Sequence, residues 1–261
     1  MSNLIHLGTT AFGCSVDVQC GARLSSLRIN SVERLVGNSR GAAATAWGAY
    51  PMVPFAGRVR DGRFTHNHQL HQLQRNAEPH AIHGTVFDVA WITTEQSPSH
   101  AVCVASLGRR WPFRGAVEHR IEVDVRERSV TCTLTVSTTD ASMPAQVGWH
   151  PWFVRPATLD VAFAAMYIRD VHYIPDGQRS APTVGPWDDC FVEPHRTPAV
   201  VFSDGVRIDI ESDCDHWVIY DKPTHALCVE PQSGPPDGFS LAPHVITPNT
   251  PLRRTMKLIA R

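Results

Sequence analysis

VEHRIEVDVRERSVTCTLTV, residues 117–136, is the stretch of this sequence that decides the fold. Apolar side chains alternate with polar ones at a period of two on both sides of a short polar segment. Valine, isoleucine and threonine, which favour strands, supply most of the alternating positions. A turn near Arg126 to Ser129 would join the two halves, so we expect an antiparallel hairpin.

Shorter runs with strand-like composition recur through the rest of the sequence. The segment QCGARLSSLRINSVERLVG, residues 19–37, predicts two strands joined by a turn near Asn30 and Ser31. Residues 40–49 are too short and too closely flanked by glycine to predict a helix. Roughly ten short strands without helical periodicity indicate an all-β fold, a β-sandwich or barrel. The other expected strands are residues 101–106, 159–163, 199–202, 206–210, 217–220, 225–229 and 252–260.

Composition narrows the class of protein. The 261 residues are 43% hydrophobic and 19% charged with a net charge of -1, which favours neither disorder nor nucleic-acid binding. Prolines and glycines are spread evenly, with no linker or repeat, so we expect one domain over residues 1–261. Seven scattered cysteines fit reduced thiols, and no signal peptide or membrane-spanning segment is present. We therefore expect a cytoplasmic protein that binds no membrane.

Common catalytic motifs are missing from the sequence. There is no GxSxG, GxGxxG, Walker or HExxH pattern, which weakens serine hydrolase, nucleotide-binding and zinc protease functions. The histidines of HNHQLH, residues 66–71, have the spacing of a possible metal cluster, but such spacing is a weak signal.

The segment CVEPQSGPPDGFS, residues 228–240, places Glu230 at the end of an apolar run. Pro231 has a fixed φ and no amide donor, and Pro235 and Pro236 are incompatible with a helix. We expect the strand to end at the acid and a rigid, open loop to follow. Taken alone, Glu230 is either a catalytic carboxylate or a solvated strand-end glutamate, and the second is commoner.

Four other polar groups lie beside rigid or aromatic residues. Arg58 follows a turn in YPMVPFAGRVRDGRF (50–64), where a guanidinium suits vicinal hydroxyls or a carboxylate, although surface arginines are common. His83 in HAIHG (80–84) and His150 in VGWHPWF (147–153) suit proton transfer, or belong to the core. Asp188, with Asp189 in PWDDCF (186–191), either accepts hydroxyl hydrogen bonds or satisfies a turn.

Taken together and in this order, these segments resemble the aldose 1-epimerase (galactose mutarotase) family from about residue 20 to the C-terminal strand. The segments that carry the resemblance are CGARLSSL, PFAGRVRDGRF, HAIHG with Trp91, VGWHPWF, DDCF and VEPQSGPPDGF. The resemblance implies a large antiparallel β-sandwich, the galactose mutarotase-like supersandwich, with a sugar site on one concave sheet.

The resemblance also implies residue roles. Glu230 matches the family's general base and His150 its general acid, while Arg58, His83 and Asp188 match substrate-binding positions. The implied reaction interconverts the α and β anomers of a hexose and needs no metal or organic cofactor, because every step is a proton transfer. It calls for an ionised Glu230 beside a charged His150, and the nearby carboxylate is expected to raise the histidine pKa.

Three residues depart from the family pattern. Gly57 replaces an asparagine, Trp152 a tyrosine and Gly238 an alanine, so we expect the chemistry to be kept and the sugar selectivity to be altered. Two alternatives stay open. One is an epimerase of hexose phosphates or otherwise modified sugars, which Arg58, Arg60 and Arg63 would suit; the other is a non-catalytic carbohydrate-binding protein. The sequence indicates no oligomeric state.

Overall fold

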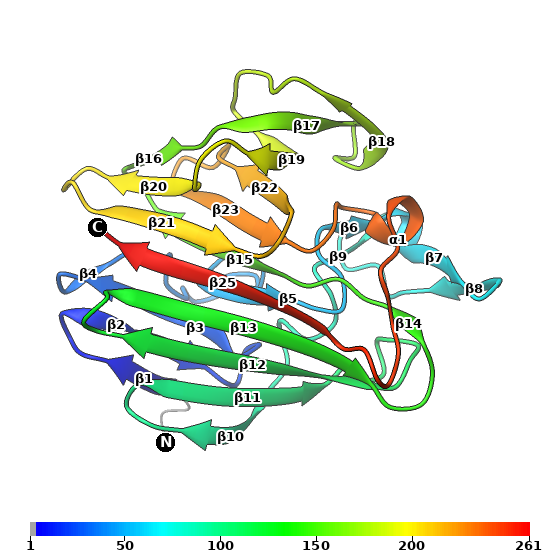
Figure 1. Cartoon of the computed structure of the whole chain (residues 1–261), viewed down its shortest axis with the longest axis horizontal. Helices are drawn as coiled ribbons and strands as arrows, with labels where there is room; N and C mark the ends of the chain where they lie inside the picture. The colour runs from blue at the N-terminus through cyan, green and yellow to red at the C-terminus, as the bar shows by residue number, and fades with distance from the viewer. Residues whose placement is uncertain (1–3) are drawn as a thin grey trace.

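Two large antiparallel sheets make up most of the computed structural model, which describes residues 4–261 (Figure 1). The larger sheet has the order β1(Leu4–Gly8), β2(Phe12–Asp17), β3(Arg23–Ile29), β5(Ala49–Met52), β15(Gly148–Val154), β23(Ala226–Gln232), β22(His216–Tyr220), β19(Asp188–Pro194), β17(Phe163–Arg169) and β18(Pro175–Ser180), with β4(Val32–Glu33) beside β3. The smaller has the order β10(Ile92–Gln96), β11(His100–Ser106), β12(Gly115–Asp124), β13(Ser129–Thr138), β25(Leu252–Ala260), β21(Arg207–Ser212), β20(Ala199–Phe202) and β16(Ala157–Asp160). The expected all-β sandwich is confirmed.

The central hairpin of the sequence is β12 and β13, which pair from Gly115 opposite Thr138 to Asp124 opposite Ser129. Their alternating apolar side chains, including Val117, Ile121 and Leu134, are buried. They face a continuous core to which both sheets contribute. The apolar residues at every second position of this stretch therefore form the inner face of the smaller sheet.

Strands β15 and β23 of the larger sheet differ from this pattern because nearly every residue in them is buried. On β15, Trp149 and Phe153 belong to the core between the sheets, whereas His150 and Trp152 point to the opposite face. Tyr50 and Phe87, from other segments of the chain, pack with Trp152 on that second face. Polar side chains on β15 and β23 are thus removed from bulk water although the strands lie in a sheet.

Short elements gather at one end of the sandwich, on the right of Figure 1. They are the pairs β6(Arg58–Val59) with β9(Ala81–Ile82), β7(Arg63–His66) with β8(Gln69–Gln72), and β14(Met143–Pro144) with β24(Val245–Ile246), together with the 3-10 turn η1(Arg60–Gly62) and helix α1(Gly238–Leu241). No helix among residues 4–261 is long and apolar enough to cross a membrane. All seven cysteines fall within this described part of the chain, and none forms a disulfide there.

Two expectations about strand boundaries were wrong. Residues 159–163 are not one strand, because β16 ends at Asp160 in one sheet and β17 starts at Phe163 in the other. The strand carrying Glu230 does not end at the acid but continues through Pro231, which lies opposite Trp217, to Gln232. The irregular segment begins only at Ser233, and α1 follows the two prolines rather than containing them.

Arg23 on β3 is a fully buried cation that ties loops to the larger sheet. Its guanidinium lies 4.1 Å from the Trp47 ring centroid and 5.1 Å from that of Tyr50. It donates hydrogen bonds to the backbone carbonyls of Cys20, Ala44, Trp47 and Phe87 at 2.6–2.9 Å. Arg23 therefore packs against the Tyr50 ring and helps to hold it in position.

We expect Arg23→Met to lower the free energy of unfolding by about 3 kcal/mol, because it leaves buried carbonyls without donors. Urea unfolding followed by fluorescence measures this. Arg28→Met is the matched control, since Arg28 lies on the same strand and is exposed; it should change stability by less than about 0.5 kcal/mol. Equal effects of the two substitutions would contradict the role of Arg23.

Candidate active site

A cavity of about 310 Å³ opens on the outer face of the larger sheet. Neighbouring strands contribute side chains to it at every second position, so that one face of the sheet forms its floor. The floor residues are His150 and Trp152 on β15, Glu230 and Gln232 on β23, Val218 and Tyr220 on β22, Asp188 and Cys190 on β19, and Tyr167 and Arg169 on β17.

The register of β15 and β23 places His150 beside Glu230. These strands pair Gly148 with Gln232 and Trp152 with Cys228, and the same register puts His150 across from Glu230. The Nε2 atom of His150 lies 3.3 Å from Oε1 of Glu230. The other carboxyl oxygen, Oε2, accepts a hydrogen bond of 3.1 Å from the Gln232 amide. The side chains of the pair are only 6% and 2% exposed, so they can exchange a proton out of contact with bulk water.

Aromatic rings fix the orientation of the His150 imidazole. Tyr50 stacks on it at a centroid distance of 4.9 Å, and Trp152 stacks at 5.1 Å. The ring of His83 meets it edge-on at 5.1 Å. This packing leaves the imidazole little freedom to rotate, which suits a group that must transfer a proton to one atom.

The remaining three sequence-predicted residues also line the cavity. Arg58 and His83 lie on or next to the paired strands β6 and β9, and the His83 amide donates to the Gly57 carbonyl at 3.0 Å. Asp188 starts β19, while its neighbour Asp189 is engaged by Arg169. The structure thus brings all five predicted site residues together, from segments up to 172 positions apart, the separation of Arg58 and Glu230.

Burial disfavours charge on both members of the central pair. It lowers the pKa of His150 from 6.5 to about 3. Burial, and then the charge of Asp188, raise the pKa of Glu230 well above its ordinary value, despite the opposing effects of Gln232 and Arg58. The expectation of a charged His150 with a raised pKa beside an ionised Glu230 was therefore wrong. Burial therefore favours the neutral forms of both Glu230 and His150 over the charged pair.

His83 is neutral for the same reason. Burial and the neighbouring His150 and Arg58 lower its pKa well below the usual value. Its Nδ1 atom and the Oε1 atom of Gln232 are buried without a hydrogen-bond partner among residues 4–261. Unpaired buried polar atoms are costly, so a ligand carrying hydroxyl groups would be stabilised here.

Among the described residues, the side chains that could together hold a metal ion lie in this site. Within residues 4–261, only His150, Cys228 and Glu230 form a group of ligand atoms close enough to share an ion. Burial raises the pKa of the Cys228 thiol well above its ordinary value, which opposes the thiolate that a metal requires. Two histidines of HNHQLH make contacts other than with a metal: His66 forms a hydrogen bond with Ser142, and His71 stacks on Phe64.

Gln232, Arg169, Tyr173 and Lys222 lie at or near the site and were not anticipated from the sequence. Gln232 follows Glu230 by two residues on one strand, so the period of two would have found it if the strand had been extended past Pro231. Arg169, Tyr173 and Lys222 have no comparable signal, because they are polar residues at strand ends and in turns.

Comparison with known proteins agrees with this geometry. The family model for aldose 1-epimerase matches residues 4–253. The chain belongs to the aldose 1-epimerase family. The uncharacterized protein YphB of Escherichia coli K12 is 34% identical over 131 residues, 48% of this chain and 43% of that protein. The match thus spans less than half the length of this curated relative.

Solved structures share the fold over the whole chain. A galactose 1-epimerase from Lactobacillus acidophilus superimposes with a TM-score of 0.83 and 17% identity, covering 99% of this chain and 94% of that one. An aldose epimerase homologue from C. elegans gives 0.86 and 12%, covering 100% and 99%. A galactose mutarotase-like protein from Clostridium acetobutylicum gives 0.85 and 14%, covering 99% and 95%. At these identities the likeness establishes the fold.

The departure at Gly57 has a structural explanation. Gly57 has φ +66°, and a Cβ placed there would lie 2.9 Å from the Cβ and Cγ atoms of Pro236. The ring of Pro236 thus occupies space next to the backbone that leads into Arg58. The proline-rich segment after Glu230 packs directly against the other wall of the site.

His150 is expected to make folding sensitive to acid. Between pH 6.5 and about 3 the unfolded chain protonates this imidazole and the folded chain does not, so lowering the pH favours unfolding. Replacing His150 by Gln should reduce the loss of unfolding free energy between pH 7 and pH 5 by about 2 kcal/mol. Urea titrations at both pH values test this.

Glu230→Gln should act in the opposite direction in the same titrations. The raised pKa of Glu230 gives stability that is fully present below pH 4.5 and lost as the pH rises. Removing the carboxyl group should therefore enlarge the loss of unfolding free energy between pH 7 and pH 5. The same pH dependence in both variants and wild type would contradict the burial argument.

Gly57→Ala tests the contact with Pro236. Gly205 is the matched control, because it has φ +86° and no atom lies within 4 Å of the place that an alanine methyl group would take. Gly205→Ala should cost about 1 kcal/mol of unfolding free energy for the left-handed conformation alone. Gly57→Ala should cost about 1–3 kcal/mol more, because the methyl group overpacks against Pro236. Equal costs in urea unfolding would rule out a tight contact.

Proposed function

We propose that this protein is an aldose 1-epimerase, which interconverts the α and β anomers of an aldose by opening and closing the ring. The observation that carries the proposal is the buried pair of His150 and Glu230, 3.3 Å apart on the floor of a cavity. Ring opening needs one group that gives a proton and one that takes a proton, both within reach of the anomeric centre. Membership of the aldose 1-epimerase family supports this reaction class.

The proposed mechanism requires that the pair hold one proton. Glu230 removes the proton of the anomeric hydroxyl while His150 protonates the ring oxygen, and the hemiacetal C–O bond breaks. Rotation about the C1–C2 bond and reclosure with the proton transfers reversed give the other anomer. The proton that rests on Glu230 in the unliganded protein must move to His150 when the sugar binds, and the 3.3 Å separation allows that transfer.

Other residues of the cavity would hold the sugar. The unpaired His83 Nδ1 and Gln232 Oε1 atoms provide buried hydrogen-bonding groups for hydroxyls. The carboxyl group of Asp188 and the guanidinium of Arg58 add an acceptor and a set of donors. Proton transfers to Glu230 and from His150 accompany the breaking and re-forming of the C–O bond, so the mechanism requires no metal or organic cofactor.

A non-catalytic carbohydrate-binding protein is the alternative from another class. Binding alone does not need an acid and a base to be buried against each other, and burying two titratable groups is costly. The His150–Glu230 contact therefore favours the enzyme. Sugar binding without acceleration of anomer exchange would favour the binding protein instead.

Glu230→Gln and His150→Gln should each slow anomer exchange about 100- to 10,000-fold, because an amide cannot transfer the proton. NMR exchange measurements on a panel of free and phosphorylated aldoses identify the best substrate, and its rate is then compared among the variants. Glu211→Gln is the matched control, since Glu211 is an exposed glutamate on β21 of the other sheet. Wild-type rates in Glu230→Gln would overturn the assignment.

A further inference from the structure

The turn at residues 170–174 brings an aromatic side chain to the cavity that the proposed reaction does not use. Tyr173 lines the cavity, and three cations pack around its ring. The Cζ atoms of Arg169 and Arg58 lie 4.3 Å and 5.1 Å from its centroid, and Nζ of Lys222 lies at 4.5 Å. Nζ of Lys222 also lies 3.4 Å from the Tyr173 hydroxyl, to which it donates a hydrogen bond.

Among residues 4–261, only one of these three cations has a close acidic partner. Arg169 is held by Asp189 through its Nε and Nη2 atoms. Across residues 4–261, neither Arg58 nor Lys222 forms an ion pair within 4.0 Å. Lys222 is exposed and Arg58 half-buried, so both cations can meet a ligand that enters the cavity.

Asp188 does not balance both free cations. Burial raises the pKa of Asp188, while Arg58, Lys222 and Arg169 favour its charged form, but among the described residues it lies in no ion pair with any of them. With Arg169 neutralised by Asp189, two cations face one carboxylate, which leaves a net charge of about +1 at this end of the cavity. A neutral sugar can accept hydrogen bonds from Arg58 but does not neutralise that net charge.

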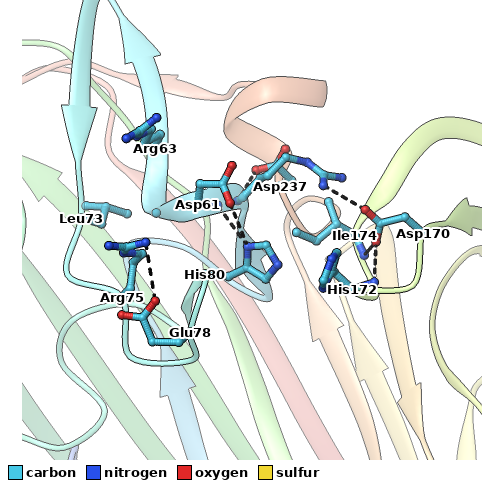
Figure 2. Close-up of polar contacts among 12 residues, drawn as sticks. Asp61, Arg63, Leu73, Arg75, Glu78, His80, Asp170, His172, Ile174 and Asp237 are labelled. Atoms are coloured by element: carbon cyan, nitrogen blue, oxygen red, sulfur yellow. Dashed lines mark hydrogen bonds and ion pairs between the residues drawn. The ribbon is translucent and has the colours of Figure 1, made fainter.

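The turn that carries Tyr173 is held in place before any ligand binds. Asp170 accepts hydrogen bonds from the backbone amides of His172 and Ile174, at 2.8 Å and 3.1 Å (Figure 2). Its other oxygen forms an ion pair of 2.9 Å with Arg60, whose own amide donates to Asp237.

The same contacts hold the two cavity walls together. Asp237 donates its amide to the Arg58 carbonyl at 2.6 Å, so the chain around Arg58 and the Tyr173 turn belong to one network. The rings of His80 and His172 pack edge-on at 5.2 Å on the same side (Figure 2). Tyr173 itself has φ +62°, a conformation that the network maintains.

We propose that Arg58, Lys222 and the Tyr173 hydroxyl form a subsite for an anionic substituent, a phosphate or a carboxylate, on the aldose. This inference rests on the proposed function and names its substrate class. Guanidinium and ammonium groups together bind such oxygens through charge-assisted hydrogen bonds, and the aromatic ring keeps the cations in place. The subsite differs from the basic group expected from the sequence, because Arg60 is paired with Asp170 and Arg63 bonds to Gln72 on an exposed hairpin.

The test compares three aldoses by NMR exchange of their anomeric signals: glucose, glucose 6-phosphate and glucuronate. We expect kcat/KM for at least one of the two anionic sugars to exceed that for glucose by about tenfold or more. Raising NaCl from about 20 to about 200 mM should increase KM for the anionic sugar and not for glucose, because salt screens the interaction. The two anionic sugars distinguish a phosphate subsite from a carboxylate subsite.

Substitutions test whether Lys222 and Tyr173 cause the preference for an anionic sugar. Lys222→Gln should lower the ratio of kcat/KM for the preferred anionic sugar to that for glucose about 5- to 20-fold, mainly through KM. Tyr173→Leu should lower the same ratio, since it removes the ring that positions the cations. Lys257→Gln, on β25 of the smaller sheet, is the matched control and should leave the ratio unchanged.

The outcomes separate this inference from the function on which it rests. Exchange of glucose as fast as that of both anionic sugars, or an equal effect of Lys222→Gln on all three, would overturn the subsite and leave the epimerase intact. Acceleration of none of the three sugars, in a folded protein, would overturn both.

Discussion

The proximity of Glu230 and His150 in a site that excludes bulk water is the constraint on which the rest of the structure depends. Two charged groups would lose several kcal/mol of hydration each in such a place, and their attraction would not fully offset that loss. The protein holds them instead as a neutral pair, with the pKa of Glu230 raised and that of His150 lowered to about 3. A pair with one proton is also what an isomerisation by two proton transfers needs.

The sandwich architecture keeps this buried pair in position. Trp149 and Phe153 anchor β15 in the core between the sheets, so His150 projects from a backbone that is held on both sides by core packing. Pro151 and Pro231 follow His150 and Glu230 on adjacent strands, where they provide no amide donors. Stiffness therefore comes from the strands themselves, because the proline-rich loop that was expected directly after Glu230 begins only at Ser233. That loop carries Pro236 against Gly57 and so shapes the far wall.

Much of the fold was predictable because its signals are local. The alternation in residues 117–136 predicted the central hairpin, and it depends only on which side chains face the core. The site residues were found through the order of their motifs, since nothing local distinguishes Glu230 from a surface glutamate. The sequence could not predict how deeply each site residue is buried or which side chains surround it. The charge state of His150 depends on burial by Tyr50, Trp152 and His83, which come from three different segments.

The same reasoning explains why the residues of the proposed anion subsite have no signal in the sequence pattern. Floor residues such as His150 and Glu230 lie on strands whose register fixes their spacing, so a change there would disturb the core as well. Tyr173 lies in a turn whose backbone is constrained by a few hydrogen bonds and one ion pair rather than by a sheet, and Lys222 lies in the loop between β22 and β23. Turn residues can be exchanged at small cost in stability. Under the proposed function, one mechanism with variable sugar specificity is the expected consequence of placing His150 and Glu230 on long strands of the sheet and Tyr173 and Lys222 in connecting segments.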